Sequence, residues 1–172
     1  MTEILQTDRL ILRTLTLDDA AFIVELVNSP GWIKYIGYRN INTIEDACNY
    51  LNNGPLKSYA VNGFGLWAIV LKNEGMPIGM CGLIKRDGLE DADLGYAVLP
   101  AYEGQGYVTE AAKAVLHYIF DILKIKRVLA ITNVDNIASI RVLEKIGFQF
   151  LRYMTMPGED KAVRLFSAVE ID

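Results

Sequence analysis

Residues 93–111 read DLGYAVLPAYEGQGYVTEA, which places a strand directly before a glycine-containing turn that opens a helix. Glycines let the backbone approach a ligand closely, and the free amides and positive dipole end at the start of a helix attract phosphate. We therefore predict a pyrophosphate site at the turn from Gly104 to Gly106. The alternative is that the two glycines only make a tight turn, and their spacing alone does not separate the two interpretations.

Two common phosphate-binding motifs do not match this turn. The dinucleotide fingerprint GxGxxG requires a third glycine, but Gly104 and Gly106 are followed by Thr109 at that position. The GK[ST] sequence of the Walker loop is absent as well. Neither NAD nor ATP is therefore the expected ligand.

The strand before the turn has two different faces, because successive side chains of a strand point to opposite sides. One face carries a carboxylate beside small or apolar residues, Asp93, Gly95, Ala97 and Leu99, and the other carries Leu94, Tyr96 and Val98. The small residues clear space beside Asp93, which makes it a candidate for chemistry. The alternative is an acid on a solvent-facing side.

Outward from this stretch, alternation and turn residues predict further strands at Arg9–Leu15, Leu66–Lys72, Pro77–Arg86, Ala92–Leu99, Arg127–Thr132, Phe148–Met154 and Ala162–Val169. The second, third and fourth of these strands, from Leu66 to Leu99, are separated by hairpin turn signals and indicate an antiparallel meander. Helical periodicity predicts helices from Ala20 to Val27, near Ile44 to Leu51, from Val108 to Leu123 and from Asn136 to Ile146. We expect a single α/β (α+β) domain over residues 1–172.

Between the first two helices, residues 29–42 are broken by Pro30, Gly31 and Gly37 and carry three aromatic residues, Trp32, Tyr35 and Tyr38. Exposed aromatic residues in such a loop often line a pocket, although they also pack against their own domain. These three residues are candidates for contact with a substrate.

The helix from Asn136 to Ile146 places an amide and the hydroxyl of Ser139 on a stripe that otherwise looks buried. Buried polar groups need partners, so both are candidates for ligand contact. A local alternative is that Asp135 caps the helix and Ser139 bonds back to it. Gly147 ends the helix as the left-handed residue after its last turn, with Phe148 supplying the accompanying contact.

Composition excludes several classes of function. The chain has 172 residues, 52% of them hydrophobic, with a net charge of -4 and no basic stripe, which argues against a nucleic-acid partner. Cys48 and Cys81 stand apart, and the one histidine, His117, lies on the polar face of its predicted helix beside Glu110, so we expect no metal site. No apolar run approaches the about 20 residues that a membrane span needs, and no signal peptide is visible, so we expect a cytoplasmic protein.

Four blocks in this order resemble the GNAT superfamily of acyl-CoA-dependent N-acetyltransferases. The blocks are TDRLILRTLTLDDA, the turn EGQGYV, the following TEA, and NIASIRVLEKIGF. The opening block is similar, more narrowly, to the RimJ/RimL-like branch, which acetylates N-terminal amines of ribosomal proteins and includes enzymes for other amines. The resemblance covers essentially the whole chain. It implies a mixed, mostly antiparallel central sheet flanked by helices, with a splayed strand pair that holds acyl-CoA.

The resemblance also implies roles for individual residues. The family's pyrophosphate motif, Q/R-x-x-G-x-G/A, falls on Glu103 to Val108, where Glu103 and Val108 depart from the usual residues. Acetyl-CoA as cosubstrate would be bound by Ala97, Val98, Gly104, Gln105, Gly106, Tyr107, Val108, Thr109 and Asn136. Asp93 would be the base, directly or through water, and Ser139 would steer a proton to the leaving thiolate. Trp32, Tyr35 and Tyr38 would bound the acceptor.

The activity implied is transfer of an acetyl group to a primary amine by direct attack on the thioester, with strand amides holding the oxyanion. The acceptor would be the N-terminal amine of a ribosomal protein or a small-molecule amine, and the negative net charge favours cationic acceptors. A different class of protein, an acyl-CoA-binding module without catalysis, is the alternative. The oligomeric state is open, because the edge strands of such a sheet either pair in a homodimer or are covered within the monomer.

Overall fold

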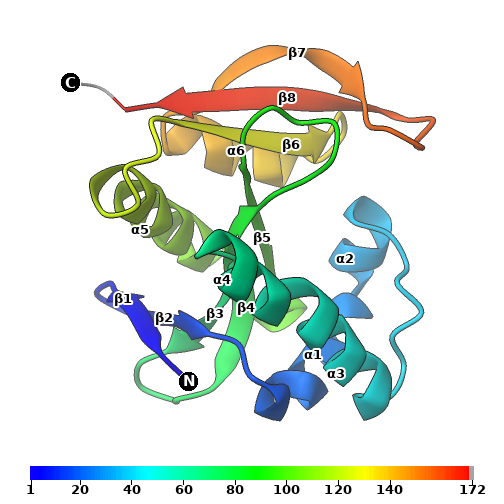
Figure 1. Cartoon of the computed structure of the whole chain (residues 1–172), viewed down its shortest axis with the longest axis vertical. Coiled ribbons are helices and arrows are strands. Elements are labelled where there is room, and N and C mark those ends of the chain that lie inside the picture. Colours follow the sequence, from blue (N-terminus) through cyan, green and yellow to red (C-terminus); the bar gives the residue numbers. More distant parts are fainter. Residues whose placement is uncertain (171–172) are drawn as a thin grey trace.

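The computed structural model describes residues 1–170 and contains one eight-stranded sheet in the order β1-β2-β3-β4-β5-β6-β8-β7 (Figure 1). The strands are β1 (Glu3–Gln6), β2 (Leu10–Thr14), β3 (Leu66–Leu71), β4 (Pro77–Ile84), β5 (Asp93–Val98), β6 (Arg127–Asn133), β7 (Gln149–Thr155) and β8 (Ala162–Val169). Every neighbouring pair is antiparallel except β5 and β6. The predicted mixed, mostly antiparallel α/β architecture is confirmed.

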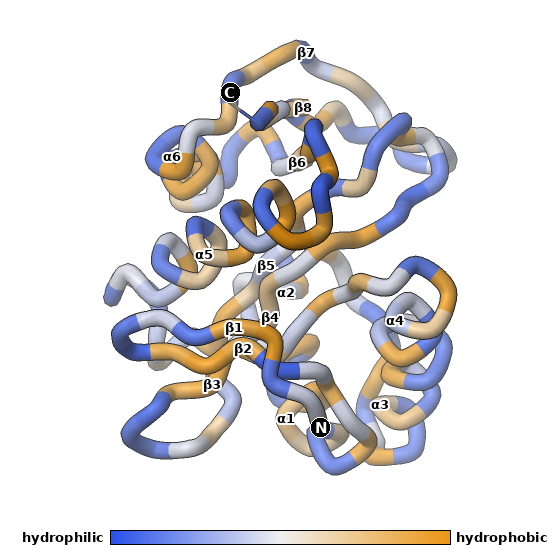
Figure 2. Tube along the Cα trace, turned by 60° about the vertical axis from the view of Figure 1, so that its left-hand side comes forward, coloured by the Kyte–Doolittle hydropathy of each residue, from blue (hydrophilic) through white to orange (hydrophobic). Residues whose placement is uncertain are grey.

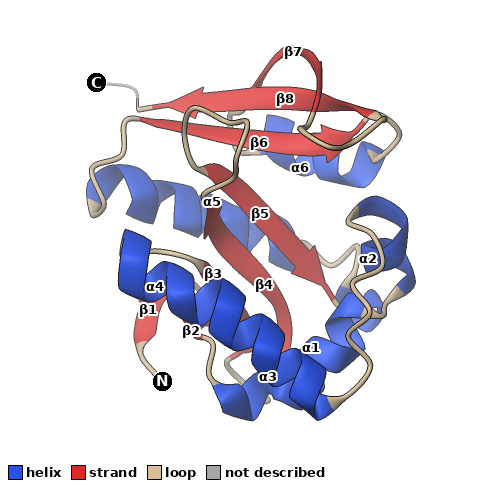
Figure 3. Cartoon of the chain, turned by 45° about the vertical axis from the view of Figure 1, so that its right-hand side comes forward, coloured by secondary structure: helices blue, strands red, loops and turns tan. Residues whose placement is uncertain are grey.

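Helices cover both faces of this sheet (Figure 3). They are α1 (Ala20–Val27), α2 (Pro30–Tyr35), α3 (Ile44–Leu51), α4 (Lys57–Asn62), α5 (Tyr107–Asp121) and α6 (Ile137–Lys145). One buried cluster joins α5 and α6 to the strands, and a second joins α1, α2 and α3 to the opposite side of β3 and β4. Because both faces are covered, β3 and β4 read as nearly continuous apolar runs.

Figure 2 shows this distribution along the chain, with apolar residues in the strands and hydrophilic residues in the turns between them. The alternation of β5 assigns its side chains to the two layers. Leu94, Tyr96 and Val98 pack with the cluster of α5 and α6, whereas Ala97 packs with the cluster of α1 to α3. The two faces of β5 predicted from its alternation are therefore directed at different helical layers.

The sheet splits between its two parallel strands. β5 and β6 are paired only at Asp93 and Leu129, where the Leu129 amide donates to the carbonyl of Ala92. Beyond this point β5 continues to Val98 and β6 to Asn133 without pairing to each other, and the strands diverge (Figures 1 and 3). The opening therefore widens toward the carboxyl ends of both strands, where α5 and α6 begin.

Three local predictions need correction. The sheet opens with β1, not with the strand at Arg9, because this short edge strand shows no alternation that would reveal it. Residues 30–35 form helix α2 instead of a broken loop, since Pro30 at the first helical position has the φ angle that a helix needs. Asn136, not Asp135, caps α6, and its side-chain oxygen accepts the backbone N–H of Ser139.

The predicted end of α6 is confirmed. Gly147 has φ +97°, its N–H donates to the carbonyl of Glu144, and the N–H of Phe148 donates to that of Leu143. These are the two hydrogen bonds that satisfy carbonyls at a helix end through a left-handed residue. The turn fixes the direction in which the chain leaves α6 to begin β7.

Two glycines offer a matched test of the packing beside β5. A Cβ at Gly82 in β4 would lie 2.1 Å from the carbonyl oxygen of Gly65, whereas a Cβ at Gly54 meets nothing within 4 Å. We expect Gly82→Ala to lower the free energy of unfolding by about 1–3 kcal/mol through overpacking. We expect Gly54→Ala to change it by less than about 1 kcal/mol, because the gain of alanine in a helical segment is opposed by the restriction on a residue before Pro55. Urea denaturation of both variants measures this, and equal stabilities would contradict the close strand approach.

Candidate functional site

A cavity of about 1210 Å³ lies at the split between β5 and β6. Most of the predicted site residues line it: Trp32, Tyr35, Asp93, Ala97, Val98, Gly104, Gly106, Tyr107, Val108, Thr109, Asn136 and Ser139. The cavity is bordered by the start of α5 and by α6 on one side of the sheet and by α2, α3 and α4 on the other. The fold thus brings together segments that are distant in the sequence.

The turn before α5 presents unbonded backbone amides to this cavity. Gly104 and Gly106 both have positive φ, +70° and +82°, and Gly106 is the N-cap residue of a helix that has no side-chain cap. The first intrahelical bond is donated by Glu110 to the carbonyl of Gly106, so the amides of Tyr107, Val108 and Thr109 precede it. Uncapped amides at the start of a 15-residue helix are suited to bind phosphate oxygens.

Of the turn residues Glu103 and Gln105, only Glu103 lines the cavity, although Gln105 was the one predicted to bind the cosubstrate. Gln105 is absent from its lining, because its side-chain amide donates to the carbonyl of Ala101 and its own carbonyl faces Arg9. The Glu103 carboxylate lies beside Gly31, where a Cβ would meet Oε1 at 3.4 Å. The charge of Glu103 is thus directed at the start of α2.

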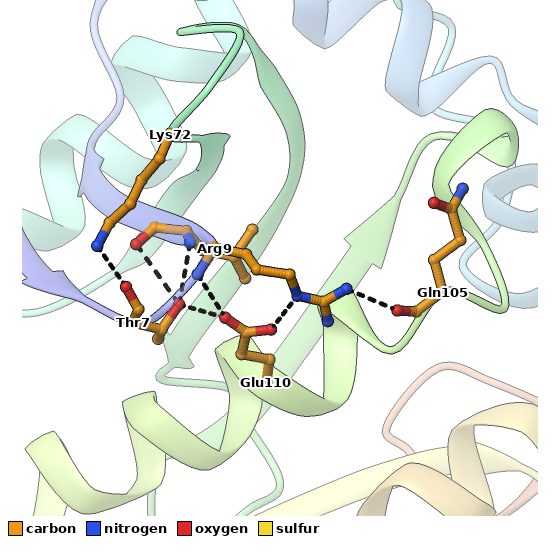
Figure 4. Close-up of polar contacts among 6 residues, drawn as sticks. Thr7, Arg9, Lys72, Gln105 and Glu110 are labelled. Atoms are coloured by element: carbon orange, nitrogen blue, oxygen red, sulfur yellow. Dashed lines mark hydrogen bonds and ion pairs between the residues drawn. The ribbon is translucent and has the colours of Figure 1, made fainter.

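A polar cluster fastens the turn to the beginning of the chain (Figure 4). The Glu110 carboxylate accepts from the Thr7 hydroxyl at 2.6 Å, from the Arg9 backbone N–H at 3.0 Å and from Arg9 Nε at 2.6 Å. The Arg9 guanidinium also donates to the Gln105 carbonyl at 3.1 Å and lies 4.3 Å from the centre of the Tyr107 ring. We call Thr7, Arg9 and Glu110 the turn brace. Sequence periodicity missed it, since it placed Glu110 on a solvated helix face.

The backbone of β5 offers some of its amides to the opening and others to β4. The Leu99 N–H donates to the Ile78 carbonyl, and backbone groups alternate in direction along a strand. The N–H of Ala97 therefore also points to β4, whereas those of Tyr96 and Val98 point toward the split. Of the two residues expected to polarise a carbonyl, Val98 has the suitable amide, and Ala97 supplies only its small side chain.

On the α6 side of the split, a hydroxyl pair links the strand to the helix. The Tyr96 hydroxyl lies 2.9 Å from Ser139 Oγ and 3.1 Å from the Ser139 carbonyl oxygen. Burial raises the pKa of Tyr96, while the contact with Ser139 lowers it by less. Tyr96 is therefore a neutral phenol at physiological pH that orients the Ser139 hydroxyl. The sequence showed that Tyr96 and Asp93 lie on opposite faces of the strand, but it did not show that Tyr96 contacts Ser139.

On the opposite face, Asp93 is paired with a residue that the sequence did not single out. Its carboxylate is 1% exposed, and its two oxygens lie 2.9 Å and 3.0 Å from Nε of Arg86, which follows β4. Burial raises the pKa of Asp93, and the charge and hydrogen bond of Arg86 lower it by less. Asp93 is thus a buried carboxylate with an increased affinity for a proton, not a solvent-facing acid.

The three aromatic candidates have different environments. Trp32 is 6% exposed within the core of α1 to α3, and its indole N–H is buried without an acceptor among the described residues. The backbone carbonyl of Tyr35 accepts from Asn133 at the end of β6, which holds α2 across the open end. Tyr38 is 59% exposed, bonds to Asn40 and Asn42, and does not line the cavity. Only Trp32 and Tyr35 remain candidates for acceptor contact.

Over residues 1–170, no group of three or more His, Cys, Asp or Glu side chains is placed to bind a metal ion. His117 is exposed on α5, as its pattern predicted. In the same described part of the chain, no helix has the length and apolar character required to cross a membrane.

Comparison with known proteins agrees with this geometry. The sequence model of the acetyltransferase (GNAT) domain matches residues 9–149. The uncharacterized N-acetyltransferase YoaA of Bacillus subtilis is 30% identical over 99% of this chain and 98% of its own length. A GNAT-family acetyltransferase from Bacillus anthracis has a similar structure, with a TM-score of 0.80 and 26% identity over 98% of both chains.

A further similar structure is RimL, described as a ribosomal L7/L12 alpha-N-protein acetyltransferase in complex with coenzyme A. Its TM-score is 0.82 at 18% identity, with 97% of each chain covered. The chain belongs to the GNAT family of acetyltransferases. It is an amino-group acetyltransferase that uses acetyl-CoA, and the uncapped amides before α5 and the split beside β5 fit that cosubstrate.

The turn brace predicts a pH-dependent contribution to stability. Burial raises the pKa of Glu110, but the hydrogen bonds from Thr7 and Arg9 and the Arg9 charge together lower it below its usual value of 4.5. A carboxyl group with a depressed pKa stabilises the fold above its unfolded pKa, and this is lost as the pH falls through its folded pKa. We expect Glu110→Gln to be less stable than the wild type at pH 7.

Urea denaturation at pH 7, 5 and 3 measures this effect, and the stability difference should shrink as the pH falls below 4.5. Glu144→Gln, which removes an exposed carboxylate from α6, is the matched control and should change little at any pH. A difference for Glu110→Gln that stays constant down to pH 3 would show that the charge of Glu110 contributes nothing through the brace.

Proposed function

We propose that the chain acetylates a primary amine that enters from the α1–α4 side of the split, while acetyl-CoA lies against α5 and α6. The observation that carries this proposal is the single pairing between β5 and β6, which opens the sheet to both helical layers. The donor and the acceptor then meet at Val98 from opposite faces of one strand.

Donor binding begins at the turn before α5. The amides of Tyr107, Val108 and Thr109 bind the pyrophosphate, and Gly106 allows the backbone to approach it without a side chain. Because these contacts are made by the backbone, Val108 donates as well as the family's usual residue would. The Nδ2 amide of Asn136, whose oxygen caps α6, is available to the pantetheine arm.

Transfer requires a neutral amine, since a protonated amine is not a nucleophile. Asp93 accepts that proton, and its raised pKa favours this role. The carboxylate is buried, bonded to Arg86 and five residues from Val98 on β5, so the proton reaches it through a chain of water molecules in the cavity. The amine then attacks the thioester carbonyl, whose developing negative charge is stabilised by the Val98 amide.

The leaving thiolate is stabilised on the α6 side. Ser139 donates its hydroxyl proton toward the sulfur in a hydrogen bond, and Tyr96 holds that hydroxyl from 2.9 Å away. A thiol has an ordinary pKa of about 8.5, so the thiolate needs only modest assistance. Ser139 is the group that touches the reacting sulfur, and Tyr96 is a positioning residue.

The acceptor is either an N-terminal amine of a ribosomal protein or a small-molecule amine. RimL, whose fold is similar, supports the first class through its described activity on L7/L12. The enclosed aromatic wall formed by Trp32 and Tyr35 supports the second. A screen of both classes with acetyl-CoA, monitored by CoA release, distinguishes them and also tests for an acyl-CoA-binding module without turnover.

Titration calorimetry of acetyl-CoA into the protein tests the donor site, with NADH and ATP as controls. We expect binding of acetyl-CoA alone. Gly106→Val should weaken it by about tenfold or more, since a branched side chain at φ +82° is strained and blocks the approach to the amides. Unchanged affinity in Gly106→Val would place the phosphate site elsewhere, and no binding to the wild type would refute the use of acetyl-CoA.

Steady-state kinetics test the two proton-transfer roles. We expect Asp93→Asn to lower kcat by about a hundredfold or more, with acetyl-CoA affinity retained and the acidic limb of the pH–rate profile lost. Ser139→Ala and Tyr96→Phe should lower kcat by less, and the double variant should be no slower than Ser139→Ala alone. An unchanged kcat in Ser139→Ala removes this residue from the mechanism, and additive losses in the double variant contradict a shared role.

A further inference from the structure

The wall of the cavity has the opposite charge from the chain as a whole. The chain has a net charge of -4, but six cationic side chains line the cavity against two carboxylates. The cationic residues are Arg39, Lys57, Lys85, Arg86, Arg141 and Lys145. The expectation of a cationic acceptor, which rested on net charge, does not describe the surface that a substrate meets.

The six cationic side chains differ in their positions and in their partners. Arg141 and Lys145 are on α6, which borders the donor, and the phosphates of acetyl-CoA account for positive charge there. Lys85 donates its ammonium group to the carbonyl of Glu90. The remaining three, Arg39, Lys57 and Arg86, are on the α2–α3 connection, at the start of α4 and after β4, outside α5 and α6. The donor's phosphates do not account for them.

Arg86 is held in a defined position with most of its donors free. Its Nε bonds both oxygens of Asp93, which is 1% exposed, while its two terminal NH₂ groups have no partner among residues 1–170. The side chain is 34% exposed at the cavity wall. A guanidinium that is anchored through one nitrogen presents its other donors as a fixed fork, the geometry that suits a carboxylate or a phosphate.

Arg39 lines the same cavity. Within the described residues it makes no ion pair, and its charge and that of Arg86 both act on Tyr50 of α3, whose pKa burial raises and the two arginines lower. Arg39, Tyr50 and Arg86 all line the cavity. Of the two carboxylates that line the cavity, Asp93 is bonded to Arg86 and Glu103 lies beside Gly31 at the start of α2. Arg39 and the terminal donors of Arg86 therefore have no ion-pair partner among residues 1–170.

We propose that Arg86 and Arg39 bind an anionic group, a carboxylate or a phosphate, on the amine that is acetylated. This inference rests on the proposed function and names the chemical class of its acceptor. Asp93 then has a second task, because it positions Arg86 as well as accepting the proton.

The length of β5 limits the shape of such an acceptor. Asp93 and Val98 are five residues apart on an extended strand, which corresponds to about 17 Å. The amine reacts near Val98, and the anion is bound by Arg86 beside Asp93. The two groups of the acceptor are therefore separated by a chain of several bonds and are not carried on the same carbon atom.

Three acceptors of equal chain length, long enough to extend along β5 from Val98 toward Arg86, test this proposal: 10-aminodecanoate, 10-aminodecyl phosphate and 10-aminodecan-1-ol. We expect kcat/KM of at least one anionic amine to exceed that of the alcohol by about tenfold or more, mainly through KM, because hydrogen bonds to charged groups are the stronger ones. The carboxylate and phosphate arms show which anion is preferred. Equal kcat/KM for all three would overturn the proposal.

Variants identify the residues responsible. Arg39→Gln, and Arg86→Lys, which keeps the charge but loses the fork, should raise KM for the anionic amine by about tenfold. In Arg39→Gln, KM for the alcohol and affinity for acetyl-CoA should stay unchanged. Arg152→Gln, an exposed arginine on β7 outside the cavity, is the matched control. Thermal melts show whether Arg86→Lys folds, and Arg39→Gln, which leaves Asp93 paired, keeps the test independent of that result.

The failures of the two proposals are distinguishable. If other amines are acetylated but these anionic ones are not preferred, the acceptor class is wrong and the transferase activity stands. If acetyl-CoA binds and no amine of any class is acetylated, the proposed function fails, and the acceptor class fails with it. Equal KM increases for the anionic amine and the alcohol in Arg39→Gln would also overturn the anion site.

Discussion

The pairing of β5 with β6 at one point is the constraint on which the rest of this molecule depends. A parallel pair that stopped pairing inside a closed core would leave backbone groups without partners, which is costly. Here those groups face a cavity in which solvent or a ligand satisfies them. Both helices that follow the diverging strands begin at this open end, and the uncapped amides of α5 lie at the proposed phosphate site.

The alternation of a single strand separates the two halves of the proposed chemistry. Tyr96 reaches the Ser139 hydroxyl in the layer of α6, whereas Asp93 faces the layer of α1 to α4 and bonds Arg86. A group that assists the leaving sulfur and a group that accepts the amine proton therefore lie on opposite sides of one backbone. The strand keeps them apart without any separate partition, because its pleat fixes the direction of each side chain.

Local signals in the sequence predicted most of the fold. The meander from β3 to β5, the turn before α5 and the stop at Gly147 each depend on neighbouring residues, and each is present. β1 was not predicted, because a four-residue edge strand is defined by its pairing with β2 and not by its own pattern. Helix α2 was taken for a loop, since its aromatic residues and glycine obscured the helical start at Pro30.

The candidate site was predictable to the extent that it is made of backbone. The glycines and the helix start at Gly106 were visible, as was the placement of Asp93 and Ser139. Side-chain partners were not, because Arg9 and Glu110 are separated by 101 residues and Tyr96 and Ser139 by 43. Arg86 is only seven residues from Asp93, but the hairpin that joins them had to be seen in three dimensions.

The turn brace also makes the beginning of the chain part of the cosubstrate site. Thr7 and Arg9 hold a turn that lies about a hundred residues later in the sequence, and a Cβ at Gly106 would lie 3.5 Å from the Arg9 guanidinium. During synthesis on the ribosome, these first residues emerge long before the segment that they must fix. Loss of Thr7 and Arg9 would therefore loosen the turn of the proposed phosphate site while leaving every residue of the cavity in place.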